Sequence, residues 1–303
     1  MKFVTFQSGA EQRLGILQDG KGILDVVKSG KALLGRDLPA TMLALIESGK
    51  SALDDARKLA DAAQSKADAW TAAAGVKLLA PIPHMRKNVF CVGRNYKLHI
   101  EEGARARGVA PSFPKVPEFF SKPPTTVIGN GDEILWDPRA TKQLDYEVEL
   151  GIVIGKRAKN VTEANALDYV FGYTIINDVS AREVQRDHGQ WFKGKSLDTF
   201  CPIGPCIVTA DEFGNPSGHR LTTRINGGIR QDSNTSDLLF NCPQIVMWLS
   251  LGLTLEPGDM IATGTPSGVA LGMNPQAWMQ HGDLCELEIE GIGVLANRVR
   301  RVD

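Results

Sequence analysis

Two apolar segments in the middle of this chain carry acidic side chains at positions that a buried strand would hide from water. The first, LDYEVELGIVIG at residues 144–155, is dominated by β-branched and apolar residues, which predicts a strand. Side chains alternate along a strand, so Glu147 and Glu149 point to the same face. The second segment, FGYTIIND, also predicts a strand and ends at Asp178. Two such strands lying side by side would bring three carboxylates together.

A group of carboxylates this close needs compensation, because like charges repel one another unless a cation lies between them. Ligands that are all oxygen favour a hard divalent ion, Mg²⁺ or Mn²⁺, with positions left open for a substrate. Glu147, Glu149 and Asp178 are therefore the candidate metal ligands. The alternative is that the glutamates lie on the solvated face of an edge strand, because acidic residues are mostly exposed. The apolar neighbours of both segments favour the buried arrangement.

The composition excludes several other classes of function. The hydrophobic fraction of 43% is that of an ordinary globular protein, and a net charge of −1 gives no field that would attract nucleic acid or an anionic membrane. No stretch approaches 18 consecutive apolar residues, and the N-terminal residues lack the features of a secretion signal. The five cysteines show no CxxC spacing, so we expect reduced thiols, no zinc site and a cytoplasmic protein.

The chain divides into two regions of different character. Residues 1–80 predict a small N-terminal α+β domain: short strands up to about residue 27, then helical structure over 38–75, with a possible capping box at Ser51 and a stop at Gly75. The prolines of LLAPIPHMRKN mark a boundary. Residues 85–303 predict many strands with loop-rich connections, which indicates a mixed, largely antiparallel sheet folded on itself.

A possible proton-transfer pair follows the boundary, in CVGRNYKLHIEEG. If a helix begins there, His99 and Glu102 lie three residues apart on one face, and a carboxylate beside an imidazole fixes its tautomer and raises its basicity. The alternative is an incidental pair on a surface helix. The following stretch, Glu101–Pro117, is rich in Gly and Pro and lacks periodicity, so we expect an irregular loop that acts as a lid.

Two further segments carry candidate substrate-binding residues. Lys195, in WFKGKS, could neutralise an anionic substrate or a developing oxyanion, with Lys193 as the competing lysine. Gln185 could donate to a substrate oxygen, and His188 is a rival general base without supporting spacing. In LEPGDMIATGTPSGV, Gly264 allows a ligand to approach the backbone closely beside Thr265. That segment lacks the spacing and the lysine of a phosphate-binding loop.

Taken together, these segments resemble the fumarylacetoacetate hydrolase superfamily. The matching motifs, which run in the family's order over roughly residues 88 to 300, are CVGRNYKLHIEE, PEFFSKPPTTVIGNGDEI, LDYEVELGIVIGK, GYTIINDVSAREVQ, WFKGKSLDTFCPIGP and LEPGDMIATGTPSGV. The resemblance is to the branch that contains acylpyruvate hydrolases and 2-hydroxyhepta-2,4-diene-1,7-dioate isomerases. It implies an α+β, β-rich fold, a roll of mixed β-sheets, usually as a homodimer.

The resemblance also implies roles for individual residues. Glu147, Glu149 and Asp178 match the family's metal ligands, and His99 with Glu102 matches a dyad that orders on lid closure in the acylpyruvate-cleaving members. The remaining matches are the catalytic Lys195 and the substrate-binding Arg94, Tyr96, Gln185, Gly264 and Thr265. Some members have a fourth metal carboxylate just upstream of the histidine, and this chain has none there.

The activity expected from the resemblance is hydrolysis of a C–C bond in a 2,4-dioxo acid, such as fumarylpyruvate or acetylpyruvate, to pyruvate and a carboxylic acid. His99, oriented by Glu102, would deprotonate a water that attacks the 4-carbonyl, and Lys195 would stabilise the oxyanion. The alternative on the same scaffold is decarboxylation of oxaloacetate, or keto–enol or double-bond isomerisation, which needs only a metal and a proton shuttle. A non-enzymatic binding protein is a third possibility, and the complete set of reactive residues argues against it.

Overall fold

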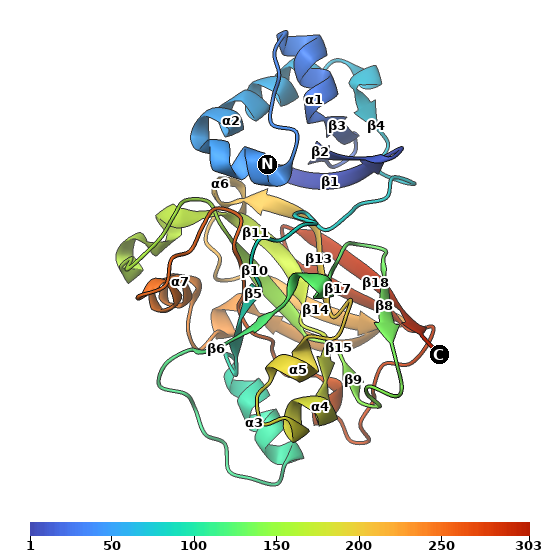
Figure 1. Ribbon diagram of the computed structural model, residues 1–303, viewed down its shortest axis with the longest axis vertical. Coiled ribbons are helices and arrows are strands. Elements are labelled where there is room, and N and C mark those ends of the chain that lie inside the picture. The colour runs from blue at the N-terminus through green and yellow to red at the C-terminus, as the bar shows by residue number, and fades with distance from the viewer.

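The computed structural model describes all residues, 1–303, and its mixed α/β, strand-rich architecture confirms the expected fold class. An N-terminal unit lies above a larger body, whose strands form the centre of the molecule (Figure 1). The elements of the N-terminal unit are β1 (Lys2–Ser8), β2 (Glu11–Gln18), β3 (Gly22–Asp25), α1 (Val26–Ser29), η1 (Gly30–Leu34), α2 (Met42–Ala63), η2 (Ala67–Ala69) and β4 (Trp70–Thr71).

The helix of this unit is shorter than the 38–75 expected from the sequence. α2 begins after Thr41, whose Oγ1 accepts from Ala44 N, and its backbone is interrupted at Gly49, where φ is 62°. The cap is therefore Thr41 and not Ser51. The helix ends at Ala63, because β4 pairs with β3 and the Trp70 indole donates to the carbonyl oxygen of Ala63 at 3.0 Å. Strand pairing outweighs the helical propensity of the Ala-rich run.

The larger body contains every other strand. Its elements are β5 (Val89–Gly93), α3 (Lys97–Ala106), β6 (Glu118–Lys122), η3 (Pro124–Thr126), β7 (Val127–Ile128), β8 (Glu133–Trp136), β9 (Leu144–Asp145), β10 (Val148–Ile154), η4 (Glu163–Tyr169), β11 (Val170–Asn177), β12 (Ser180–Ala181), α4 (Arg182–Asp187), α5 (Phe192–Lys195), β13 (Cys201–Thr209), α6 (Ala210–Phe213), β14 (Arg220–Ile225), β15 (Gly228–Asn234), η5 (Thr235–Asp237), α7 (Cys242–Ser250), β16 (Met260–Ala262), η6 (Ala270–Gly272), β17 (Leu284–Ile289) and β18 (Gly293–Arg301).

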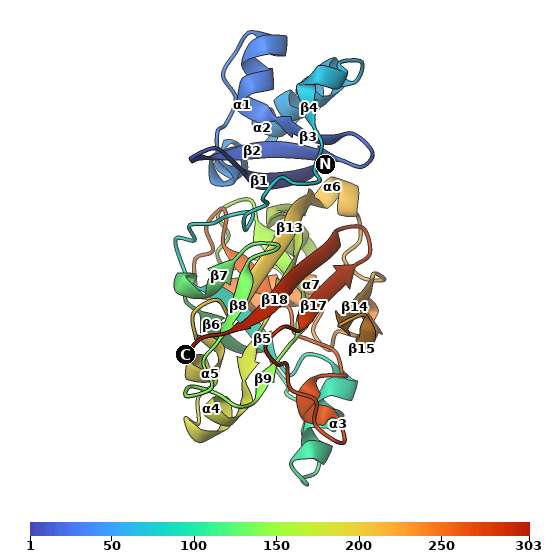
Figure 2. The ribbon, with the colours of Figure 1, turned by 90° about the vertical axis from the view of Figure 1, so that its right-hand side faces the viewer.

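One large sheet runs through both regions in the order β4-β3-β2-β1-β13-β11-β10-β16-β5-β6. The N-terminal unit joins it where β1 pairs antiparallel with β13, at Lys2 with Val208 and Phe3 with Ile207. A second sheet, in the order β15-β14-β17-β18-β8, packs beside it (Figure 2). The division at residues 80–85 stays a prediction, and the backbone pairing across it is continuous.

Strand β10 lies at the centre of the large sheet and is buried along its whole length. Val148, Leu150 and Ile152 belong to one hydrophobic cluster, whereas Val153 belongs to another on the opposite face. Glu147 and Glu149 therefore share the face of Val153, as the alternation of a strand requires. β10 pairs with β11 in a register that places Val148 opposite Asn177, so the end of β11 lies beside the two glutamates.

The segment expected to be an irregular lid is partly helical. α3 extends to Ala106, which corrects the expectation for residues 101–106, and an irregular loop follows from 107 to 117. Helix and loop project together from the lower end of the molecule (Figure 1). No helix of the structure is long and apolar enough to cross a membrane.

Candidate active site

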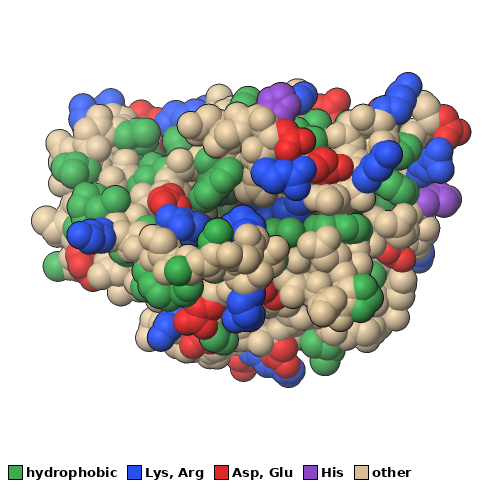
Figure 3. Space-filling model, turned by 90° about the horizontal axis from the view of Figure 1, so that it is seen from below, with side chains coloured by type: hydrophobic (Ala, Val, Ile, Leu, Met, Phe, Trp, Pro, Cys, Tyr) green, Lys and Arg blue, Asp and Glu red, His purple; other side chains and the backbone are tan.

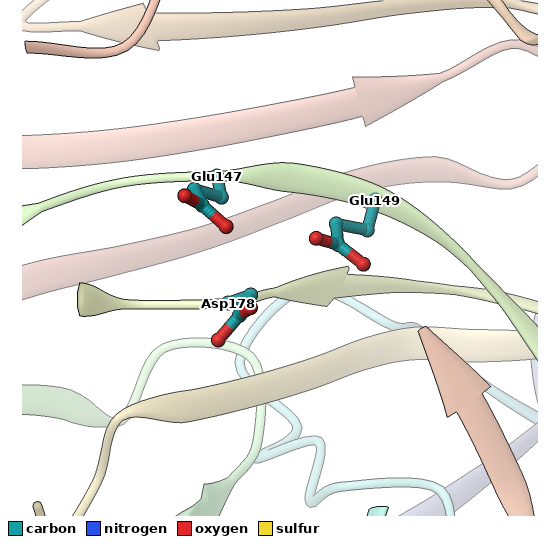
Figure 4. Close-up of side chains that lie close together, drawn as sticks. All are labelled: Glu147, Glu149 and Asp178. Carbon is teal, nitrogen blue, oxygen red and sulfur yellow. The ribbon is translucent and has the colours of Figure 1, made fainter. Parts of the chain in front are cut away.

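Three carboxylates converge at the centre of the large sheet. Glu147 precedes β10, Glu149 lies within it, and Asp178 directly follows β11. One carboxylate oxygen from each lies within 4.8 Å of the other two, and all three residues are buried. Their side chains point toward one another across the two strands (Figure 4). The backbone holds this arrangement, because Asp178 N–H donates to the carbonyl oxygen of Glu147 at 3.0 Å.

Two buried lysines bind these carboxylates. Lys195 Nζ lies 2.8 Å from Glu147 Oε2 and 2.7 Å from Asp178 Oδ2. Lys122 Nζ lies 2.6 Å from Asp178 Oδ1 and donates to the carbonyl oxygen of Val179 at 3.0 Å. Each ammonium group has three hydrogens, so each lysine retains one for another acceptor.

A second layer of charge orients Glu147. Arg182, at the start of α4, places Nη2 2.6 Å from Glu147 Oε1 and Nε 2.8 Å from Asp145 Oδ2. Asp145 in turn accepts from the backbone N–H groups of Ala270 and Leu271 in η6. The buried cluster holds four carboxylates against three cations, so one negative charge is left uncompensated.

The pKa values of these groups follow from that imbalance. Burial, and then the charges of Asp178 and Glu147, raise the pKa of Glu149 well above its ordinary value of 4.5. Burial also acts to raise the pKa of Glu147, but Lys195 and Arg182 outweigh it and hold that pKa below its usual range. Glu149 is thus the carboxyl group that most lacks a cation.

The residues fit a divalent metal. Three buried carboxylates supply only oxygen ligands, and Glu149 has no ion-pair partner, its one contact being the Gly264 N–H group at 2.7 Å from Oε2. A divalent ion here would more than offset the one negative charge that the lysines and the arginine leave over. Glu147, Glu149 and Asp178 would hold it, and Mg²⁺ and Mn²⁺ both accept this ligand set.

The His99–Glu102 pair is formed on α3. His99 Nδ1 lies 3.4 Å from Glu102 Oε2, so the spacing places both side chains on one face, as expected. Glu102 is buried, and its Oε1 accepts from Gly268 N–H at 2.9 Å. The carboxylate is therefore held from two sides, and the Nε2 atom of His99 is left for proton transfer.

The other residues expected from the sequence lie in different surroundings. Thr265 is buried next to Gly264. Gln185 accepts from Arg182 Nη1 at 3.2 Å, which links it to the charged cluster. Arg94 instead binds Glu118 and the carbonyl oxygen of Ser112 in the irregular loop. Tyr96 is buried, and its hydroxyl has no hydrogen-bond partner in the chain. Lys193 and His188, the rival lysine and histidine, are exposed.

Sequence reasoning missed four polar residues of the site. They are fully or almost fully buried, and each makes a side-chain hydrogen bond to the cluster or to the Thr265 loop: Lys122, Asp145, Arg182 and Gln231. Lys122, Asp145 and Arg182 lie inside segments quoted for their motifs, but a charged residue in an apolar strand was an available signal only for Asp145, in LDYEVELGIVIG. Gln231 had none, because NGGIRQDSNTS is polar throughout.

The lower face of the molecule carries a hollow at its centre, with Lys and Arg side chains gathered around it (Figure 3). Such a concentration of positive charge attracts anions and raises their local concentration.

Comparisons with known proteins identify relatives of this chain. Residues 88–300 match the family model described as fumarylacetoacetate (FAA) hydrolase, C-terminal. Over 305 residues the chain is 41% identical to the oxaloacetate tautomerase YisK of Bacillus subtilis (strain 168), covering 99% of this chain and 100% of that protein. Among solved structures, the fumarylacetoacetate hydrolase of the psychrophilic Exiguobacterium antarcticum is 39% identical with a TM-score of 0.81, both chains being covered completely. A maleylpyruvate hydrolase from Sphingobium sp. SYK-6, in complex with manganese(II) and pyruvate, is 30% identical with a TM-score of 0.76, also over both whole chains.

Proposed function

The chain belongs to the fumarylacetoacetate hydrolase family, and on that basis we propose that it is a divalent-metal-dependent enzyme that interconverts the keto and enol forms of a small 2-oxo acid, with oxaloacetate as the first candidate. The observation that carries the proposal is the buried carboxylate triad in a chain that matches an oxaloacetate tautomerase over its whole length. This is the isomerisation alternative that the sequence left open, and it takes precedence over hydrolysis.

The chemistry of the site supports this reaction. A divalent ion held by Glu147, Glu149 and Asp178 would supply a Lewis acid for the 1-carboxylate and 2-oxo oxygens, which acidifies the hydrogens on C3. Tautomerisation moves one proton between C3 and the 2-oxo oxygen, so it requires one positioned group that takes the proton from one of these atoms and returns it to the other, and no attacking water. His99 Nε2 provides that group, because Glu102 occupies the side of Nδ1. Lys195 retains one N–H group for a developing oxyanion.

The second candidate is hydrolysis of an acylpyruvate such as acetylpyruvate or fumarylpyruvate. The observation that favours it is the formed His99–Glu102 pair, which can activate a water as well as move a proton. The structural likeness to a maleylpyruvate hydrolase with bound pyruvate supports it too. Both reactions, and decarboxylation of oxaloacetate, share a pyruvate-like enolate stabilised at the same place, so the fate of the substrate has to be measured.

The test follows three reactions in parallel. Solid oxaloacetic acid dissolves as the enol, so loss of the enol absorbance reports tautomerisation, while pyruvate release is measured from oxaloacetate and from acetylpyruvate. We expect enol loss that depends on Mg²⁺ or Mn²⁺ and stops with a chelator, without matching pyruvate. If acetylpyruvate is cleaved to equimolar acetate and pyruvate faster than the enol of oxaloacetate is lost, the protein is a hydrolase and not a tautomerase. Unchanged turnover in excess chelator would contradict both.

Two histidine variants sharpen this test. His99→Ala should slow the enzymatic reaction by about 10²–10⁴-fold while metal affinity stays close to that of the parent protein. His188→Ala is the matched control, because His188 is exposed and makes no side-chain contact with the site. Equal activity of His99→Ala and the control would remove His99 from the mechanism.

We also propose that the protein works as a homodimer. The support, besides the family, is a set of large apolar side chains exposed on α3 and in the loop that follows: Leu98, Val109, Phe113 and Val116. Light scattering after size-exclusion chromatography should give twice the chain mass of 32.9 kDa. A monomer at micromolar concentration would rule the proposal out.

A further inference from the structure

The side chain of Gln231 is fully buried, and its amide makes two hydrogen bonds as an acceptor and two as a donor. It lies in β15 opposite Thr223 of β14 and has no exposed surface. Its Oε1 accepts from Val148 N–H at 3.1 Å and from the Thr223 hydroxyl at 2.8 Å. Its Nε2 donates to Thr265 Oγ1 at 2.8 Å and to the carbonyl oxygen of Pro266 at 2.9 Å. With two acceptors and two donors satisfied, the amide can take only one orientation.

These contacts connect the carboxylate strand to the loop after β16. Val148 stands between Glu147 and Glu149, so the bond to Gln231 holds the backbone from which both side chains extend. On the other side, Gly264 N–H donates to Glu149, and the next residue, Thr265, accepts from Gln231. The amide of Gln231 thereby fixes the distance between the triad and the hydroxyl of Thr265.

The direction of the Thr265–Gln231 bond determines what the threonine can do. A hydroxyl has one hydrogen and two lone pairs, and Gln231 Nε2 occupies a lone pair. No acceptor in the chain takes the hydroxyl hydrogen of Thr265, and the residue is buried, with only 3% of its surface exposed. Thr265 therefore carries a buried donor without a partner, next to the loop residue that touches Glu149. Buried donors of this kind are satisfied by a ligand or by water.

We propose that Gln231 is a positioning residue that compels Thr265 to act as a hydrogen-bond donor toward the carboxylate of a 2-oxo acid bound at the triad. Because the Gln231 amide presents N–H to the hydroxyl, Thr265 cannot turn its hydrogen inward, and its hydrogen is available to an anionic oxygen. Gln231 does not touch the ligand and acts only through Thr265. The inference rests on the proposed function for the class of ligand, and its test uses binding without turnover.

The experiment measures the affinity for oxalate, a stable analogue of the pyruvate enolate, by calorimetry at saturating Mn²⁺. Thr265→Val removes the donor and should weaken oxalate binding by about 10- to 100-fold, the range for a hydrogen bond to a charged group. Gln231→Glu replaces the N–H donor by an acceptor, so the Thr265 hydrogen turns toward position 231, and we expect a similar loss. Mn²⁺ affinity, measured separately in each variant, should change by less than about threefold.

The double variant that combines Gln231→Glu with Thr265→Val shows whether Gln231 acts by positioning Thr265 or through the new charge itself. If Gln231 acts through Thr265, Gln231→Glu should add less than about threefold to the loss already caused by Thr265→Val. Thr223→Val is the matched control: it removes a bond from the opposite side of the same amide and leaves the donor to Thr265 in place. It should lower stability without changing the oxalate affinity.

Two results would overturn the proposal. One is an unchanged oxalate affinity in Thr265→Val, and the other is an equal effect of Gln231→Glu with and without the Thr265 hydroxyl. If Gln231→Glu does not fold, Gln231→Met removes the donor without adding charge, and it should weaken oxalate binding only while Thr265 is present. Steady-state kinetics add a second readout, because loss of the donor should raise KM more than it lowers kcat. Normal oxalate binding in a protein that turns over no 2-oxo acid would refute the proposed function and leave this inference standing.

Discussion

Gly272 lies directly against the carboxyl group of Glu102, so that a Cβ atom added to Gly272 would overlap Cγ, Cδ and Oε1 of that side chain. Gly272 is the last residue of η6, the short turn whose first two N–H groups donate to the carboxylate of Asp145 in the charged cluster. The turn therefore touches both the proton-transfer pair and the carboxylate cluster, and the absence of a side chain at Gly272 is what allows Glu102 to reach Gly268.

Substituting Gly272 should disrupt the His99–Glu102 pair while leaving metal binding intact. In Gly272→Ala the new methyl group forces Glu102 out of its position, which breaks its bonds to Gly268 and His99. We expect turnover to fall by about 10²–10⁴-fold while Mn²⁺ affinity is kept, with rates and calorimetric titrations as the measurements. Gly103→Ala is the control, because its Cβ would meet only the flexible Arg107 side chain, at 3.4 Å. Full activity of Gly272→Ala would show that Glu102 need not occupy this position.

Removing one carboxylate should abolish metal binding without unfolding the protein. Glu149→Gln keeps the shape of the side chain and an oxygen for Gly264 N–H, but it loses the one carboxylate charge of the triad that has no ion-pair partner. We expect Mn²⁺ affinity to fall by about 100-fold or more, measured by titration calorimetry. Glu183→Gln serves for comparison, since Glu183 binds Thr141 and the backbone of Lys142 outside the triad. A metal affinity that survives in Glu149→Gln would move the site elsewhere.

Metal affinity should rise with pH. Burial and the charges of Asp178 and Glu147 raise the pKa of Glu149 in the metal-free protein above its ordinary value of 4.5, so a proton competes with the metal. A folded-state pKa above the unfolded one also means that the metal-free protein loses stability as the pH rises through the folded pKa. Calorimetry in buffers of different ionisation enthalpy should show proton release on Mn²⁺ binding that declines toward high pH. Affinity independent of pH between about 5 and 8 would contradict the raised pKa.

Lys122 should matter more for stability than any exposed lysine. Lys122→Met leaves one oxygen of the buried Asp178 carboxylate without its cation, and breaking a buried ion pair in this way costs about 3–5 kcal/mol. Urea unfolding of the metal-free protein measures the difference. Lys193→Met, on an exposed side chain, should change the unfolding free energy by less than about 0.5 kcal/mol. Comparable values for the two variants would show that Lys195 alone compensates Asp178.

The thiols should be inert in the folded protein. All five cysteines are buried, and burial raises the pKa of Cys201, Cys206 and Cys242 to about 12. Since only the thiolate reacts, Ellman's reagent at pH 8 should label no cysteine until denaturant is added, and then all five. The same shifts predict a loss of stability as the pH rises from about 9 through these folded-state pKa values. Rapid labelling of any thiol in the native protein would mean that the strand or helix that carries it opens.

The residues predicted from the sequence are those whose spacing along one or two segments fixes their geometry. Glu147 and Glu149 are two apart in a strand, and His99 and Glu102 are three apart in a helix, so local periodicity alone places each pair. Gln231 lies on a polar strand, and only its pairing with β14 brings it to Thr265. The end of α2 was also missed, because pairing of β4 with β3 is a contact between segments that are distant in the sequence.

The pairing of β1 with β13 has a consequence for how the N-terminal unit can vary. Without residues 1–80, Ile207 and Val208 would present unpaired backbone groups and apolar side chains at the edge of the central sheet. An exposed edge of this kind is a template for aggregation with another chain. The first strand, β1, therefore covers an edge of the catalytic sheet that would otherwise be open to pairing with another chain. The loops of the unit can change in length and surface so long as that strand keeps its place and α2 keeps the buried face, with Leu45 and Ile46, that belongs to the same hydrophobic cluster as Val153 of the central sheet.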